Sequence, residues 1–106
     1  MISEERLEKA LSYLARSDES CAELKGEVCR KEYLCKLARS RGFLVASGSV
    51  EQRKAEAETS EDVQKAEDEL AQAIVVFEKV KAKRQTEELI CEVWRSVNAN
   101  RRQGGM

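Results

Sequence analysis

Residues 60–97 contain neither glycine nor proline, although they make up more than a third of the 106-residue chain. Within this stretch apolar side chains recur at alternating steps of three and four residues, at Val63, Ala66, Leu70, Ala73, Phe77 and Val80. That spacing places them along one side of a helix and is typical of a coiled-coil seam. We therefore expect a helical chain that consists mostly of surface, with little room for an enclosed pocket.

The composition agrees with long, solvated helices. Charged residues make up 37% of the chain, aromatic residues only 5%, and proline is absent. The net charge of −1 argues against a surface given over wholly to nucleic acid, but it leaves room for a local basic patch. No apolar run is long enough to cross a membrane, and the first residues carry acids where a secretory signal carries bases. These features predict a cytoplasmic protein that does not contact membranes.

Four cysteines and the absence of histidine limit the chemistry. Cys21, Cys29, Cys35 and Cys91 contain no closely spaced pair of the kind that closes around zinc. Cys21 and Cys35 lie two heptads apart on one helical stripe, so they are expected to be reduced thiols facing a seam. Without histidine and without a recognisable catalytic or phosphate-binding motif, we predict no enzymatic activity, no catalytic residue, no metal, no cofactor and no small-molecule substrate.

The N-terminal half reads as one helix or two. Ser3, followed by acids, is a typical helix start. Ser17–Asp18 offers a second start, so the chain either kinks there or continues straight. Beyond it a stripe of small and apolar residues predicts a helix that ends near Ala46, and this stripe comprises Cys21, Leu24, Val28, Cys35 and Ala38.

A bend is predicted at residues 47–49. Gly48 can take the left-handed conformation that ends a helix. Ser49 and Gln52 then have the spacing of a capping box at the start of the next helix. From there to about Val97 we expect either one helix or two that join at Thr59–Ser60.

Charge is distributed in blocks that indicate how the two halves pair. Residues 1–24 and 51–69 are acidic, whereas residues 25–41 and 79–102 are basic. Folding the chain back at Gly48 sets each acidic block beside a basic one, and other alignments bring like charges together. The predicted fold is an all-α, long antiparallel helical hairpin, coiled-coil-like, over residues 1–100 as a single domain. Its N-terminal helix either continues the hairpin or packs as a third helix, and residues 101–106 form a flexible basic tail.

Two surfaces are candidate binding sites. Consecutive apolar residues at 74–77 point in different directions around the helix, so one partner helix cannot cover them all. Either the N-terminal helix covers the remaining side, or a second copy of the chain does. We therefore predict a homo-oligomer, a dimer or higher, with its interface at Val63, Leu70, Ile74, Val75, Val76 and Phe77.

The second surface is a basic strip with one tryptophan near the C-terminus. Cations that follow phosphates and a ring that stacks on a base are typical of single-strand binding. The residues are Lys79, Lys81, Lys83, Arg84, Trp94, Arg95, Arg101 and Arg102. In the alternative, Trp94 packs against Leu7, Leu11 or Leu14, and the lysines pair with the N-terminal acids.

The segments SDESCAELKGEVCRKE, GSVEQRKAEAETSEDV and EVWRSVNANRRQG together resemble small helical proteins of unassigned activity from tailed phages and prophages. Genes for such proteins lie among recombination and single-strand-annealing genes. The matching positions are Val50, Arg53, Ala55, Ala57, Ser60, Trp94, Arg95, Ala99 and Arg102, whereas Val63 stands where the pattern often has an aromatic residue. The resemblance implies an accessory protein of the host cytoplasm that acts on single-stranded DNA or with a recombination protein. The alternative function is an adaptor, or a phage inhibitor of a host nuclease or defence complex.

Overall fold

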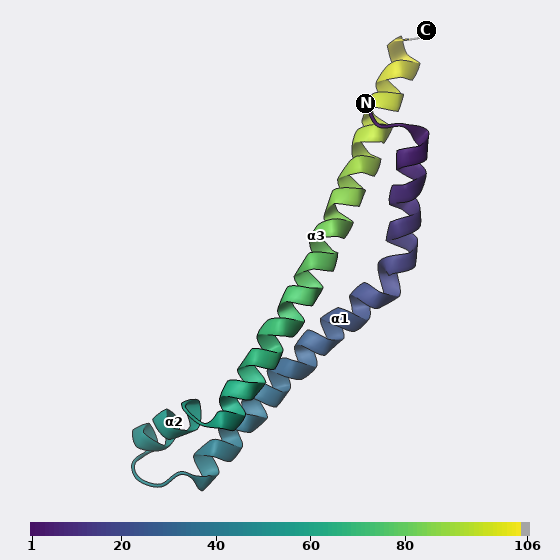
Figure 1. Ribbon diagram of the computed structural model, residues 1–106. Helices are drawn as coiled ribbons and strands as arrows, with labels where there is room; N and C mark the ends of the chain where they lie inside the picture. Colours follow the sequence, from purple (N-terminus) through teal and green to yellow (C-terminus); the bar gives the residue numbers. More distant parts are fainter. Residues whose placement is uncertain (105–106) are drawn as a thin grey trace. The chain divides into compact units, whose positions relative to one another are not determined.

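The computed structural model describes residues 1–104, and within them every regular element is a helix: α1 (Glu4–Val45), α2 (Val50–Glu58) and α3 (Glu61–Gly104) (Figure 1). Helix α1 packs against α3 with the opposite chain direction, so the fold is the predicted all-α helical hairpin. The short helix α2 stands between the two long ones in the chain.

The chain divides into two compact units, and both long helices contribute to each. Unit 1 consists of Met1–Ala22 together with the described part of Glu78–Met106, and unit 2 consists of Glu23–Phe77. The predicted domain over residues 1–100 therefore comprises two units, whose boundaries lie inside α1 and α3.

Helix α1 continues through Ser17 without a break, which decides between the two alternatives left open for the N-terminal half. The Ser17 side chain is buried, and its hydroxyl donates to the Leu14 carbonyl oxygen at 3.4 Å within the same helix. It also accepts a hydrogen bond from Arg84 at 2.5 Å. Ser17 is therefore not a helix cap, and the N-terminal helix continues the hairpin.

The bend after α1 has the predicted chemistry. Gly48 has φ +109°, a left-handed value that residues with a Cβ rarely adopt. The Ser49 hydroxyl accepts from the Gln52 backbone N–H at 3.2 Å, and the Gln52 side-chain oxygen accepts from the Ser49 N–H at 2.9 Å. This reciprocal pair is the capping box expected from the sequence.

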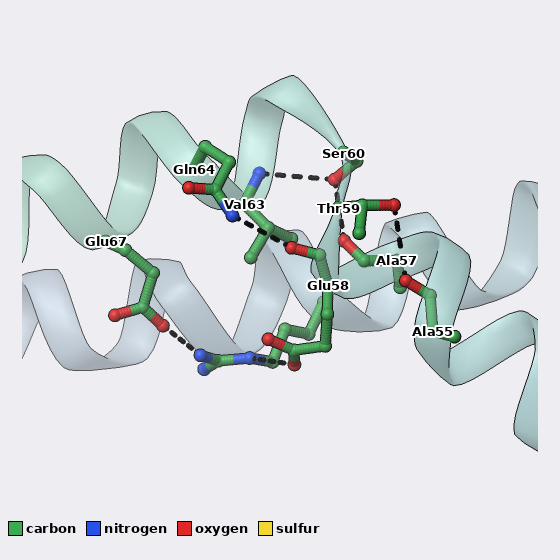
Figure 2. A network of polar contacts seen from close by, with 9 residues as sticks. Ala55, Ala57, Glu58, Thr59, Ser60, Val63, Gln64 and Glu67 are labelled. Carbon is green, nitrogen blue, oxygen red and sulfur yellow. Dashed lines mark hydrogen bonds and ion pairs between the residues drawn. The ribbon is translucent and has the colours of Figure 1, made fainter.

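A joint at Thr59–Ser60 separates α2 from α3 (Figure 2). Of the two predicted alternatives, the structure therefore has two helices and not one continuous helix. The Ser60 hydroxyl donates to the Ala57 carbonyl at 2.8 Å and accepts from the Val63 N–H at 3.3 Å. The Thr59 hydroxyl lies 3.1 Å from the Glu56 carbonyl, to which it donates. Local side chains therefore satisfy the backbone groups that the joint releases.

The end of α3 differs from the prediction. The sequence predicts fraying after Val97 and a tail from residue 101, but the helix runs to Gly104. No proline interrupts residues 98–104, and Arg101 and Arg102 lie in the last turn, where positive charge interacts favourably with the helix dipole. The remaining residues of the predicted tail, 105–106, lie outside the described part of the chain.

The two units have different cores. In unit 2 the buried apolar side chains are those of Cys35, Ala46, Ala57 and Val63. In the described part of unit 1, Ala10 is the one buried apolar residue, and two polar residues, Ser17 and Glu87, are buried with it. After Val80 the spacing of three and four continues, and its next two positions are the polar residues Arg84 and Glu87, followed by Cys91 and Trp94.

Candidate interaction surfaces

Arg84 occupies the first polar seam position of α3 in unit 1. Its Nη1 donates to the Leu14 carbonyl oxygen at 2.8 Å and to the Ser17 hydroxyl at 2.5 Å, and its Nη2 donates to Asp18 at 2.6 Å. The guanidinium thereby uses two of its nitrogens on α1. Arg84, which was predicted to bind nucleic acid, therefore contacts α1 and helps to hold the two helices together.

One turn later Glu87 forms an ion pair with Arg6 of α1. Nη2 of Arg6 lies 2.8 Å from each oxygen of the Glu87 carboxylate, and the Glu87 side chain is only 8% exposed. The hydrogen bond from Arg6 lowers the pKa of Glu87, and the same hydrogen bond raises the pKa of Arg6. This pair reverses the predicted pattern, because here the base comes from the acidic N-terminal block and the acid from the basic block.

The lysines of the predicted basic strip are placed differently from one another. The Lys83 ammonium lies 4.4 Å from the centre of the Tyr13 ring, and the Arg16 guanidinium lies 5.4 Å from the same centre. Lys79 and Lys81 are exposed. The structure therefore places Lys83 against an aromatic ring of α1, whereas the alternative paired the lysines with the N-terminal acids.

Trp94 lines an open hollow in unit 1. Its side chain is half-buried, and the other lining residues are Met1, Ile2, Val93, Val97, Asn98 and Arg101. Trp94, Asn98 and Arg101 follow one another at steps of four and three, so they share one side of α3. Arg95 and Arg102 are exposed in the same turns. Asn98 was not among the predicted binding residues, although its position four residues after Trp94 places it on the same side of the helix.

The hollow also bears on the predicted packing of Trp94. The residues from the N-terminal segment that line it are Met1 and Ile2, and none of the three leucines proposed as packing partners is among them. Arg101 reaches the same segment, since its Nη2 lies 2.8 Å from the Met1 Sδ. The tryptophan therefore sits beside the start of the chain, before α1 begins.

Unit 2 shows the predicted pairing of a basic stretch with an acidic one. Arg39 of α1 donates from Nε to Glu58 at 2.6 Å and from Nη2 to Glu67, so it links the end of α2 with the start of α3 (Figure 2). The hydrogen bond to Glu58 is the main cause of the raised pKa of Arg39. Lys31 lies 3.2 Å from Glu69. Partly exposed pairs of this kind contribute about 0–1 kcal/mol each, and their main effect is on alignment.

The predicted interface residues do not share one environment. Val63 is completely buried within the chain and has no surface to offer a partner. Leu70 and Phe77 are half-buried seam residues, whereas Ile74, Val75 and Val76 are exposed. Sequence reasoning missed other exposed apolar residues, which are Leu11, Leu89, Val93 and Val97 in unit 1 and Tyr33, Leu44, Val45 and Val50 in unit 2.

A second open hollow lies in unit 2, between the end of α1 and α2. Its lining residues are Arg39, Ser40, Phe43, Leu44, Lys54, Ala57 and Glu58. A Cβ added to Gly42 would lie 3.0 Å from the Cβ of Ala57, so the two helices approach closely beside the hollow. One signal for this approach is present in the sequence, namely a glycine within the small-residue stripe of α1.

The cysteines are free and differ in accessibility. Cys29 is exposed, Cys21 and Cys91 are half-buried, and Cys35 is buried, which raises the pKa of its thiol. Among residues 1–104 no cluster of histidine, cysteine or acidic side chains is arranged to hold a metal ion, and no helix is long and apolar enough to span a membrane. No protein-family model, curated protein or solved structure matches this chain. Its function must therefore be inferred from the surfaces of the two units themselves.

Proposed function

We propose that this chain is a non-enzymatic helical interaction protein that self-associates. The observation that carries the proposal is the imbalance of unit 1, where the described residues bury a single apolar side chain, that of Ala10. On the same unit Leu89 is 58% exposed, Val93 42% and Val97 36%, and they follow one another at steps of four along α3. We refer to these three residues as the α3 stripe.

The α3 stripe has the form of a helix-contact surface. Leu89 lies on the side of α3 away from the seam residues Glu87 and Cys91. Val93 and Val97 also line the hollow beside Trp94, yet all three remain exposed after α3 has paired with α1. Exposed apolar rows of this kind typically mark contact surfaces, and a second copy of the chain carries the same row.

Self-association is tested by measuring mass against protein concentration, using light scattering or sedimentation equilibrium. We expect a dimer or larger species, and we expect the double substitution Leu89→Lys and Val93→Lys to shift the mass to that of the monomer, because it places two charges in an apolar contact.

The matched control is Glu88→Lys, which changes the net charge by the same two units at an exposed position of the same helix outside the row of the stripe. It is expected to leave the assembly intact. A wild-type chain that stays monomeric at high micromolar concentration would contradict the proposal. If Ile74, Val75 or Val76 substitutions dissociate the assembly instead, the interface lies in unit 2, as the sequence predicted.

A second candidate function, contact with single-stranded DNA, is favoured by the hollow around Trp94. An indole that stacks on a base, an amide that can pair with a base edge and a guanidinium that can reach a phosphate are supplied there by Trp94, Asn98 and Arg101. The exposed side chains of Arg95 and Arg102 add positive charge beside it. In the phage proteins that the chain resembles, such contact would accompany recombination.

Trp94 is the one tryptophan of the chain, so its fluorescence reports on this hollow directly. Titration with a single-stranded oligonucleotide at low salt is expected to quench the emission. The substitutions Arg95→Glu and Arg102→Glu should weaken binding and reduce the salt slope by about one for each phosphate that the variant no longer neutralises.

The control variant carries Lys25→Glu and Arg30→Glu, which remove the same positive charge from exposed positions of unit 2. It should bind the oligonucleotide almost as the wild type does. An unquenched tryptophan at micromolar protein, or equal weakening in the two variants, would eliminate this candidate and leave the adaptor function.

A further inference from the structure

The hollow between the end of α1 and α2 is held in shape before any partner arrives. Helix α2 is fixed at its start by the Ser49 capping box and at its end by the Ser60 hydroxyl. Arg39 crosses from α1 to Glu58 at 2.6 Å, and Gly42 allows the backbones to approach closely. Because these contacts already restrain both helices, binding there would require little reorganisation of the chain.

Apolar side chains line and surround this hollow. Phe43, Leu44 and Ala57 contribute to its lining. Leu44 is 80% exposed, Val45 beside it in the chain is 87% exposed, and Val50 at the start of α2 is 58% exposed. A group of large apolar side chains this exposed marks a contact site.

The same region carries positive charge that the chain leaves unneutralised. Residues 36–58 contain five bases and three acids, and Arg39 is the one base among the five that forms an ion pair within residues 1–104. Lys36, Arg41 and Lys54 are exposed. The guanidinium of Arg53 lies 5.7 Å from the centre of the Phe43 ring, and its Nε is buried without a hydrogen-bond acceptor in the described structure.

We infer that this hollow is a docking site for an acidic segment of a partner protein that carries a large apolar side chain. The apolar side chain enters between Phe43, Leu44 and Ala57, and neighbouring carboxylates pair with Lys54 and Arg41. A buried apolar anchor supplies most of the affinity of such contacts, and complementary charge supplies orientation and speed of association. The inference extends the proposed function, since its residues lie in unit 2, whereas the α3 stripe lies in unit 1.

A hollow favours a protein side chain over a lipid surface, because a flat bilayer touches its rim and leaves its floor empty. A second copy of this chain is the other occupant that chemistry allows, since residues 51–69 are acidic. Both alternatives predict results that differ from those of a partner segment, so one set of measurements separates the three.

The test uses fluorescence anisotropy with the full chain and a synthetic 12-residue peptide in which two leucines, four residues apart, stand among glutamates and aspartates. We expect micromolar binding, and at least about tenfold weaker binding of the peptide in which serine replaces both leucines, because that peptide has no apolar anchor. The variants Leu44→Ser and Lys54→Glu should each weaken binding by a similar factor. Both positions are exposed, so the fold should tolerate these changes.

Leu89→Ser and Lys79→Glu are the matched controls, since they make the same changes at exposed positions of unit 1. They should leave peptide binding unchanged. Equal weakening in both sets of variants, or no binding of the leucine peptide at 100 µM protein (roughly the weak limit of specific contacts), would overturn the inference.

Two further outcomes would also overturn it. Sedimentation with vesicles containing phosphatidylserine, in the absence of peptide binding, would assign the region to a membrane surface. Loss of self-association on Leu44→Ser, with the Leu89→Lys and Val93→Lys variant still assembled, would assign it to a second copy. Failure of the α3 stripe to mediate self-association leaves the peptide result unaffected, so the two proposals fail separately.

Discussion

At the scale of single residues, the most informative positions are the charged ones in the seam of α3. Arg84 and Glu87 continue the spacing of three and four that runs from Val63 to Val80, and both form hydrogen bonds with α1. Sequence reasoning found the first half of the seam because its members are apolar, and it assigned Arg84 to a solvent-facing basic strip. The spacing alone predicts that both side chains face α1, but their charge led to the opposite prediction for Arg84.

Glu87 makes the stability of the fold sensitive to acid. Its pKa is lowered in the folded chain by the hydrogen bond from Arg6, so its stabilising effect is present above the pKa of an unfolded glutamate, about 4.3, and is lost as pH falls through the lower folded value. Removing this carboxylate with Glu87→Gln should therefore destabilise the protein at pH 7 and make little difference near pH 2. Urea unfolding followed by circular dichroism across this range measures the effect.

Glu88→Gln is the control, because Glu88 is the exposed neighbour of Glu87 on the same helix. Its unfolding free energy should stay close to that of the wild type at every pH. If Glu87→Gln follows the wild type from pH 7 to pH 2, then the Arg6 contact contributes nothing to folding.

At the scale of elements, local signals predicted most of the helix boundaries. The bend at Gly48 and the capping box of Ser49 are confirmed, and the structure decides for a joint at Thr59–Ser60, which was one of two alternatives. Each of these features depends on chemistry within about four residues. One alternative depended on a contact from further away. Ser17 has the residue type of a cap, but Arg84 of α3 holds its hydroxyl inside a continuous helix. Helix α3 ends at Gly104 and not near Val97 as predicted, because no strong stop signal precedes Gly104.

Gly48 should be the least replaceable residue of the bend. A Cβ there would meet the Gln52 Oε1 at 2.3 Å, and the φ of +109° is unfavourable for any residue with a side chain. We expect Gly48→Ala to destabilise the chain by about 1–2 kcal/mol. Chemical denaturation followed at the helical circular dichroism signal gives the free energy of unfolding.

Gly26 provides an internal comparison for the same substitution. It lies within α1, and an added Cβ there would meet nothing within 4 Å. Gly26→Ala should stabilise the protein by about 0.5–1 kcal/mol, as is usual for a glycine in the middle of a helix. Changes of the same sign at both positions would contradict the role assigned to the bend.

At the scale of the whole molecule, the charge blocks predicted the antiparallel pairing correctly. Within unit 2, Lys31 and Arg39 meet Glu69 and Glu67, and within unit 1, Arg84 meets Asp18. The division into two units and the hollow beside α2 were not predictable in this way. The hollow depends on how closely α1 and α2 approach each other; Gly42 is compatible with that approach, but the sequence does not identify Ala57 as the residue that Gly42 meets.

The hydrogen bonds of Arg84 affect how α1 and α3 align with each other. Its partners Ser17 and Asp18 lie 67 and 66 positions away in the sequence, and the contact is made entirely by atoms outside the bend. Contacts along the lengths of the helices therefore contribute to their correct alignment in addition to the bend. A protease cut at residues 47–49 would leave Ser17 and Asp18 on one peptide and Arg84 on the other. We expect the two separate peptides to associate again in the same register through these contacts.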